Sequence, residues 1–352
     1  MKKIKTTYCR FALFGLLILA GISSCDVHEF PSVEEKTSVT LEFRFDTVLP
    51  LHQVITLPSS KAASSSAEDY DLRYTINVYR ADGQGEFGRE AYATIVETKD
   101  DVTALEHSVT LEMESGVYRF IAWADYVDAG SQDHKFYNTD RFEEITLYGE
   151  EHYGNCLFRD AFRGSADLEI ATGENRQLTV DMERPLARYS FIATDLEEFI
   201  TKATQALALR AASGTQPQDG DGTTPTQAID LGDYRVIFRY TGYMPSSFNL
   251  FTDKPADVLT GVEFEGSIKQ LNDKEAELGF DYVFVNGTES SVQVAVAIYD
   301  QAGNLLSQTE EISVPVVRSK HTTVKGEFLT TEASGSVGIS PGFDGEWNVE
   351  IQ

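Results

Sequence analysis

Apolar and polar residues alternate along most of the chain, as they do in half-buried β-strands. The segment SVTLEFRFD, residues 38–46, places Val39, Leu41, Phe43 and Phe45 on one face and polar side chains on the other. The segment LRYTINVYR, residues 72–80, repeats the alternation. Similar segments, separated by turn residues, continue to near the end of the chain, and Asn286-Gly287 between two of them predicts a hairpin turn. Short strands at this spacing predict antiparallel β-sandwiches.

One stretch has the period of a helix instead. In TDLEEFITKATQALALRAA, residues 194–212, apolar residues recur three and four positions apart, which predicts an amphipathic helix near 195–211. Gly, Pro and polar residues at 213–227 predict a mobile loop. Pro185 interrupts the strand pattern, so we expect a domain boundary there. The sequence thus predicts an all-β protein with two antiparallel β-sandwich domains, 38–185 and 186–352, and one short helix in the second.

The first 24 residues have the parts of a lipoprotein signal peptide. A basic start, MKKIK, precedes the apolar run 11–22, whose 12 residues fall short of the ~20 that span a bilayer. The sequence Ile22-Ser23-Ser24-Cys25 resembles a bacterial lipobox, in which the cysteine thiol accepts diacylglycerol and the freed amine can take a third chain. Residues 1–24 are therefore a predicted signal peptide and Cys25 a predicted lipidation site. The less favoured alternative is an ordinary signal with an incidental cysteine.

Residues 25–37 form a predicted acidic tether. They are polar, contain Pro31 and show no strand or helix period. Acidic residues directly after a lipidated cysteine resemble the surface-export signal of Bacteroidota lipoproteins. We therefore expect a protein anchored in the outer membrane by lipid on Cys25 and facing the cell exterior, with the periplasmic face left open as an alternative.

The charge of the chain bears on its partners. The 352 residues include 56 acidic and 29 basic ones, for a formal net charge of −27. Removal of residues 1–24 takes away four basic residues and no acidic one, which leaves −31. A protein with this much negative charge repels the phosphate backbone of nucleic acids. We find no basic patch in the sequence that would offset the repulsion, and we therefore expect no nucleic-acid partner.

No known catalytic or metal-binding motif stands out. The six histidines lack HExxH or HxH spacing, and the chain has no GxSxG elbow, P-loop or GxGxxG motif after a strand. We therefore predict no enzyme activity, cofactor or metal. Cys156 is the single cysteine after Cys25, so no disulfide can form within the body of the chain. We interpret it as a small buried residue, with a reactive thiol as the alternative.

Two tryptophans are the candidate ligand-binding aromatics. Trp123 lies in YRFIAWADYV, residues 118–127, and Trp347 lies near the C-terminus. Core packing is the favoured role of Trp123. The alternative is that Trp123 or Trp347 forms an exposed platform on which a sugar ring stacks.

Several segments together resemble one known family. They are the lipobox, VDMERPLARYSF between the two halves, YRFIAWADYVD and RDAFRG in the first half, and GFDYVFVN and VPVVRSKHTTVKGEFLT in the second. In this order they resemble the fimbrillin-like, Mfa-type fimbrial lipoproteins of Bacteroidales nearly end to end, and more closely an uncharacterised-domain branch of that superfamily.

The resemblance implies two transthyretin-like sandwiches and a structural role in fimbriae or adhesion, with partners such as fimbrial subunits bound by β-strand addition. In the polymerising members of the family, a protease cuts after a basic residue and removes the lipid and the first strand, whereas anchor subunits keep both. Here that strand would be residues 38–46. The following 47–71 hold a single Lys or Arg, Lys61, and Arg73 comes next. This favours an anchor or standalone lipoprotein. A glycan-binding surface lipoprotein of a polysaccharide-utilisation system is the main alternative, and an enzyme with a scattered site is a third.

Overall fold

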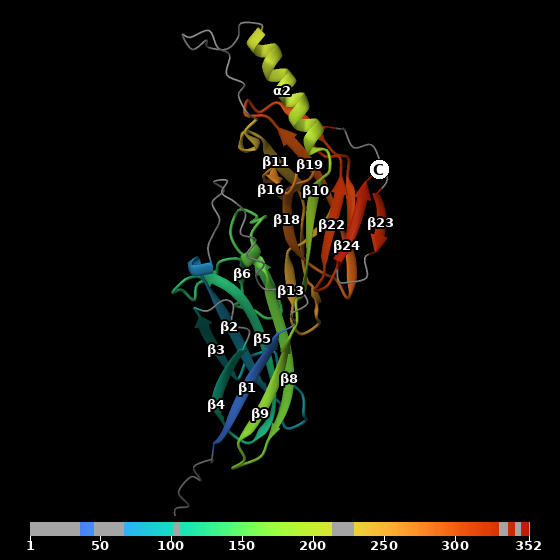
Figure 1. Cartoon of the computed structure of the whole chain (residues 1–352). Coiled ribbons are helices and arrows are strands. Elements are labelled where there is room, and N and C mark those ends of the chain that lie inside the picture. The colour runs from blue at the N-terminus through green and yellow to red at the C-terminus, as the bar shows by residue number, and fades with distance from the viewer. Residues whose placement is uncertain are drawn as a thin grey trace, which may run out of the picture.

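The computed structural model describes residues 36–45, 67–100, 106–212, 229–330, 337–341 and 346–351. Most of these residues lie in strands, which form two stacked bodies joined end to end (Figure 1). The prediction of an all-β protein of sandwich type with one helix is confirmed.

The first body is a sandwich of a three-stranded and a four-stranded sheet. The first sheet has the order β4 (Glu106–Met113), β1 (Thr37–Phe45) and β9 (Arg176–Met182). The second has the order β3 (Ala93–Lys99), β2 (Tyr70–Arg80), β5 (Gly116–Asp128) and β8 (Ala161–Ile170). The alternating apolar residues of β1 and β2 meet in one buried cluster between the two sheets.

The second body contains a six-stranded and a five-stranded sheet. The larger has the order β17 (Lys269–Gln270), β18 (Ala276–Phe284), β10 (Leu186–Ala193), β22 (His321–Gly326), β24 (Glu346–Ile351) and β23 (Val337–Pro341). The smaller has the order β16 (Glu263–Gly266), β11 (Arg235–Tyr240), β19 (Glu289–Tyr299) and β20 (Leu305–Gln308), and β21 (Ile312–Val317) also pairs with β19.

A smaller sheet joins the two bodies. Its order is β14 (Lys254–Pro255), β13 (Ser247–Asn249), β7 (Ile145–Leu147) and β6 (Tyr137–Asn138), so it pairs strands from both halves of the chain. A two-stranded ladder of β12 (Met244–Pro245) and β15 (Val258–Leu259) lies beside β13 in the sequence. Short 3-10 helices occur at Ala67–Asp69, Leu157–Arg159 and Leu231–Asp233.

The single described α-helix, α2 (Leu196–Ala212), stands at the end of the second body (Figure 1). Leu196 and Phe199, in its first turn, are buried in the core of that body, whereas Leu209 is 73% exposed. The prediction of a helix near 195–211 is therefore confirmed. The helix is anchored near its start, where Ile200 also packs against that core, and its later residue Leu209 lies in solvent.

The structure describes some of the other predicted segments and not others. The Asn286-Gly287 dipeptide also predicts a hairpin, which is wrong. Gly287 has a positive φ of 74°, but the chain passes there from β18 in the six-stranded sheet to β19 in the five-stranded one, and these two strands do not pair. The signal peptide 1–24, Cys25, most of the tether 25–37 and the loop 213–227 lie outside the described residues. The domain limits at 185 and 186 remain a prediction; β9 ends at Met182 and β10 begins at Leu186.

Candidate functional site: a central first strand and the junction of the sandwiches

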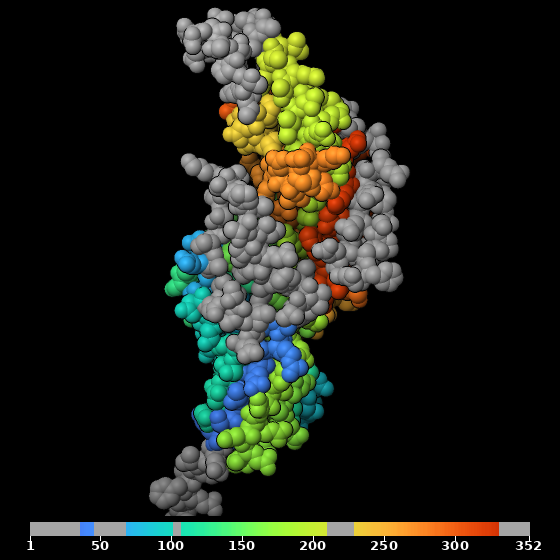
Figure 2. All heavy atoms as spheres, viewed as in Figure 1, coloured from blue at the N-terminus to red at the C-terminus, as the bar shows by residue number. Residues whose placement is uncertain are grey.

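The first strand, β1, occupies the middle of its sheet. It runs antiparallel to β4 over residues 37–44 and parallel to β9 over residues 39–45. In the space-filling view, β1 (blue) lies on the surface of the first body beside β9 (Figure 2). Both edges of β1 are therefore paired, although the strand comes from the very start of the described chain.

The inward side chains of β1 fill an apolar slot. Val39 and Leu41 are fully buried, and Phe43 and Phe45 are 4% and 7% exposed. Phe45 meets Phe162 edge-on at a centroid distance of 4.9 Å. Full burial of a side chain of this size contributes about 1.5–3 kcal/mol, so the four together hold β1 firmly in the slot.

Polar contacts fix the start of β1. The Thr37 hydroxyl donates to the Ala171 carbonyl at 3.1 Å and accepts from the Gly173 amide at 3.2 Å, which ties it to the turn between β8 and β9. Where β8 meets β9, a Cβ at Gly164 would lie 2.6 Å from the Met182 sulfur. Glycine is needed there because the two sheets approach so closely.

The slot also contains a histidine. His107 on β4 stacks on Phe43 at 5.9 Å and contacts the Glu97 carboxylate at 3.1 Å. Burial and the charge of Lys99 lower the pKa of His107 more than Glu97 raises it. The ring is therefore neutral at physiological pH and packs as part of the apolar wall.

The junction between the two bodies holds a second set of notable residues. Asp281 on β18 is fully enclosed and is paired with Arg159 and, at 2.6 Å, with the His152 ring, both from the first half of the chain. The Tyr240 hydroxyl donates to the same carboxylate at 2.6 Å and accepts from Tyr189 at 2.8 Å. Burial raises the pKa of Asp281, but Arg159 and His152 outweigh it, so the net pKa is lowered and Asp281 is ionised.

Two other buried arginines pair with aspartates in the first body. Arg184 contacts both oxygens of Asp160, at 2.9 and 2.8 Å. Arg73 forms a two-point pair with Asp125, at 3.0 and 2.8 Å. Such pairs are worth little as surface contacts, but breaking one inside a protein leaves an uncompensated buried charge.

A cavity of about 570 Å³ opens at the junction. Its walls come from the segment 147–153 of the first half and from β16 and the residues before it in the second half. Tyr148 and Tyr153 are 45% and 41% exposed, and Phe264 is buried. Four glutamates also line it, at 150, 151, 263 and 265.

The candidate residues from the sequence have different environments in the structure. Trp123 is fully buried and meets Tyr137 edge-on at 5.4 Å, so its ring is a core element and offers no exposed platform. Trp347 lies in β24 opposite Thr322 and Pro341, and its side chain lies outside what the structure describes. Cys156 is a free, partly buried thiol whose pKa is raised by burial, as suits a packed residue. Cys25 lies outside the described residues.

Sequence patterns did not indicate the junction residues. His152, Arg159 and Asp281 are up to 129 positions apart, and none belongs to a motif. A charged residue within the strand pattern GFDYVFVN was the one available signal, because Asp281 interrupts an otherwise apolar strand. Within the described ranges, no cluster of three or more His, Cys, Asp or Glu residues is arranged to hold a metal ion. No described helix is long and apolar enough to cross a bilayer.

Comparisons with solved structures found similar chains at low identity. The fimbrial anchor protein Mfa2 from Porphyromonas gingivalis is 11% identical, with a TM-score of 0.37 over 78% of this chain and 81% of that one. A candidate cell adhesion protein from Bacteroides ovatus is 10% identical, with a TM-score of 0.42 over 82% and 92%. Another from Bacteroides uniformis is 12% identical, with a TM-score of 0.38 over 92% and 99%.

A search of curated proteins found no match. The family model of DUF6562, described as a family of unknown function, matches residues 34–352, which is nearly the whole chain. This agrees with the expectation of an uncharacterised-domain branch. The chain therefore belongs to the DUF6562 family.

Proposed function

We propose that this protein is a lipid-anchored surface protein of the fimbrial-anchor or adhesion type, which acts structurally and binds its partners by β-strand addition. The observation that carries the proposal is the position of β1. A strand from the start of the chain completes the middle of a sheet, with four inward side chains in an apolar slot.

The apolar slot explains why the retention or removal of β1 would decide between an anchor and a polymerising subunit. Without β1, the facing edges of β4 and β9 would expose unpaired amides and carbonyls beside an empty apolar slot, which a strand of another subunit could fill. With β1 in place, the slot is occupied. A chain that keeps β1 also keeps the residues before it, and with them the predicted lipid on Cys25.

Retention of β1 is supported by the scarcity of cleavable basic residues after it. Lys61 is the single Lys or Arg in residues 47–71. The next, Arg73, is 1% exposed in β2 and paired with Asp125, so a protease cannot reach it in the folded protein. We therefore favour an anchor or accessory component over a trimmed stalk subunit.

The partner-binding element that we propose is the C-terminal hairpin. β24 pairs with β22, and β23 forms the edge of the six-stranded sheet. An edge strand offers its outer row of backbone groups to a strand from a fimbrial subunit. Deletion of residues 337–352 is expected to abolish co-purification with fimbrial subunits, and normal assembly of the deleted protein would count against this role.

Metabolic labelling with an alkyne palmitate tests the anchor. The wild-type protein and the Cys156→Ala control should carry the label, and Cys25→Ala should not. N-terminal sequencing of the protein from the cell surface should give either a start at Cys25 or, where the amine carries a third chain, a blocked N-terminus. A free start at Ala62 or Tyr74 would show that β1 is cut away, and a wild-type protein without label would refute lipid anchoring.

A further inference from the structure

The cavity at the junction has the chemistry of a carbohydrate site, which the structural role proposed above does not require. We propose that it binds a neutral sugar unit of a glycan chain. The proposal replaces the exposed tryptophan platform considered from the sequence, because Trp123 is buried.

The aromatic wall is the first observation. Tyr148 and Tyr153 keep 45% and 41% of their surface exposed while their rings are held by edge contacts, to His134 at 5.4 Å and to Phe136 at 5.6 Å. A tyrosine held in one orientation offers an apolar face and a polar hydroxyl together. That combination matches a sugar ring, which has an apolar C–H face and a rim of hydroxyls.

The charges of the wall decide between neutral, anionic and cationic ligands. Glu150 and Glu151 are exposed carboxylates, and Arg159, the one Lys or Arg among the described residues that line the cavity, is already paired with Asp281. This disfavours phosphate and sulfated glycans. Glu263 and Glu265 are paired with Arg239 and Arg235, and this pairing weakens the electrostatic attraction of the cavity for a cationic ligand. Carboxylates in this setting are good acceptors for sugar hydroxyls, because hydrogen bonds to an ionised acceptor are stronger than neutral ones.

The cavity wall is also built rigidly, as a preformed site needs to be. Asn155, with a left-handed φ of 56°, accepts from the Phe280 amide at 2.7 Å and donates to the Glu265 carbonyl at 2.6 Å. A Cβ at Gly154 would lie 2.0 Å from the Phe264 ring, so the backbone packs directly on that ring. Arg159 donates to the Tyr153 carbonyl at 3.1 Å. These contacts hold residues 148–155 against the second body before any ligand arrives.

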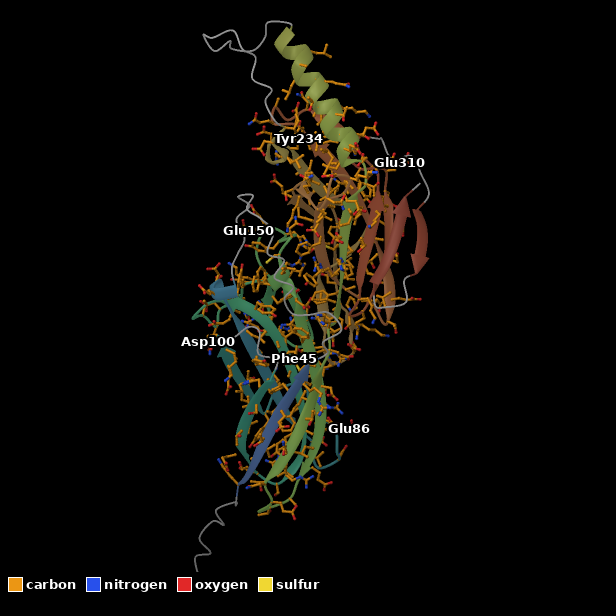
Figure 3. The ribbon with its side chains drawn as sticks, in the orientation of Figure 1. Phe45, Glu86, Asp100, Glu150, Tyr234 and Glu310 are labelled. Atoms are coloured by element: carbon orange, nitrogen blue, oxygen red, sulfur yellow. The ribbon has the colours of Figure 1, made fainter. Side chains whose placement is uncertain are left out.

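The cavity residue Glu150 has a control residue of the same type far from the cavity. Glu150 lies at the level where the two bodies meet, whereas Glu86 lies far from it on the first body (Figure 3). The two glutamates are both exposed and therefore give a matched pair of variants.

Isothermal titration of the full-length protein in detergent, with neutral gluco-, manno- and xylo-hexaoses, tests the proposal. A heparin hexasaccharide and a hexalysine peptide serve as the anionic and cationic probes. We expect at least one neutral hexaose to bind, the heparin fragment not to bind, and Tyr148→Ala, Tyr153→Ala or Glu150→Gln each to weaken binding about tenfold or more. The controls Tyr92→Ala and Glu86→Gln should bind as the wild type does.

Three results would overturn the proposal. The first is that the folded protein binds no neutral hexaose at millimolar concentration. The second is that the three cavity variants bind the hexaose as tightly as the wild type does. The third is that hexalysine binds and that its binding depends on the same three residues. The last would assign the cavity to a basic peptide instead. None of them bears on the lipid anchor, whose palmitate labelling is a separate measurement.

Discussion

Replacement of Asp281 by asparagine tests how the two sandwiches are held together. Asparagine keeps the shape of the side chain and removes its charge, so it opens no cavity. In the wild type the Asp281 carboxylate faces Arg159 and, at 2.6 Å each, His152 and Tyr240. The side chains of Arg159 and Asp281 are 3% and 1% exposed, so water cannot take the place of the lost charge.

The magnitude follows from that enclosure. Removing one partner of a buried ion pair costs about 3–5 kcal/mol, because the other charge stays buried without compensation. We expect Asp281→Asn to lower the free energy of unfolding by this amount in urea titrations of the full-length protein at pH 7. Fluorescence in a Trp347→Phe background reports the transition, since Trp123 is then the single tryptophan and its ring centroid lies 6.5 Å from that of Phe284 on β18. The exposed control Asp133→Asn should change stability by no more than about 0.5 kcal/mol.

A double-mutant cycle with Arg159→Met separates the ion pair from general damage. The two single variants should each leave one buried charge, whereas the double variant leaves none, so it should be more stable than the sum of the singles predicts by about 0.5–3 kcal/mol. A loss below about 1 kcal/mol in Asp281→Asn, or strict additivity in the cycle, would refute the reasoning. Since the pKa of Asp281 is lowered, its contribution is complete at neutral pH and is lost only as the pH falls through that lowered value.

Three further substitutions test other parts of the structure. Leu41→Ala, in the buried middle of β1, should lower the free energy of unfolding in urea by about 2–5 kcal/mol. The control Arg44→Ala, on the exposed face of β1, should lower it by less than about 0.5 kcal/mol. Equal losses in the two variants would contradict the burial of β1 in an apolar slot. Burial, and then the charge of Arg188, lower the pKa of His321 to about 3, so the folded ring stays neutral while the unfolded one takes up a proton below about pH 6.5. Stability should therefore be complete above that pH and fall by at most about 1.4 kcal/mol per unit between 6.5 and 3, whereas His321→Gln should remove this slope from pH-dependent melts. Gly154→Ala should lower the free energy of unfolding by about 1–3 kcal/mol in thermal melts, because the added Cβ clashes with the Phe264 ring. The control Gly88→Ala, whose Cβ would lie in open space, should leave the stability nearly unchanged.

The elements that the sequence predicted correctly are those with a local cause. The alternation in 38–46 gives β1, and the helical spacing in 194–212 gives α2. Each pattern depends on residues close together in the chain. A period of two or 3.6 therefore identifies the element without knowledge of its neighbours.

The junction could not be predicted because its partners are far apart and its strands are short. β7 and β13 have three residues each and pair across about a hundred positions, so neither carries a period. Alternation also cannot show whether the second face of a sheet is covered. In β2 the polar residues Arg73, Thr75 and Asn77 are 1–8% exposed. Residues after β5 cover part of that face, since Arg73 donates to the Gln132 carbonyl, and Phe251 of the second half meets Tyr79 of the same strand edge-on.

The direction of β1 links the proposed anchor to the rest of the molecule. β1 runs from the free end of the first sandwich toward the second, and Phe45, its last residue, lies near the place where they meet (Figure 3). If lipid on Cys25 holds the start of the chain, a pull on the second sandwich loads β1 along its own length. The ladder bonds to β4 and β9 lie across that direction and share the load over eight and seven residue pairs, instead of opening one at a time. The same geometry requires the junction to pass the force on, and the buried pair of Arg159 and Asp281 together with the shared sheet of β7 and β13 supplies that connection. An anchor that keeps β1 thus depends on the junction as much as on the lipid.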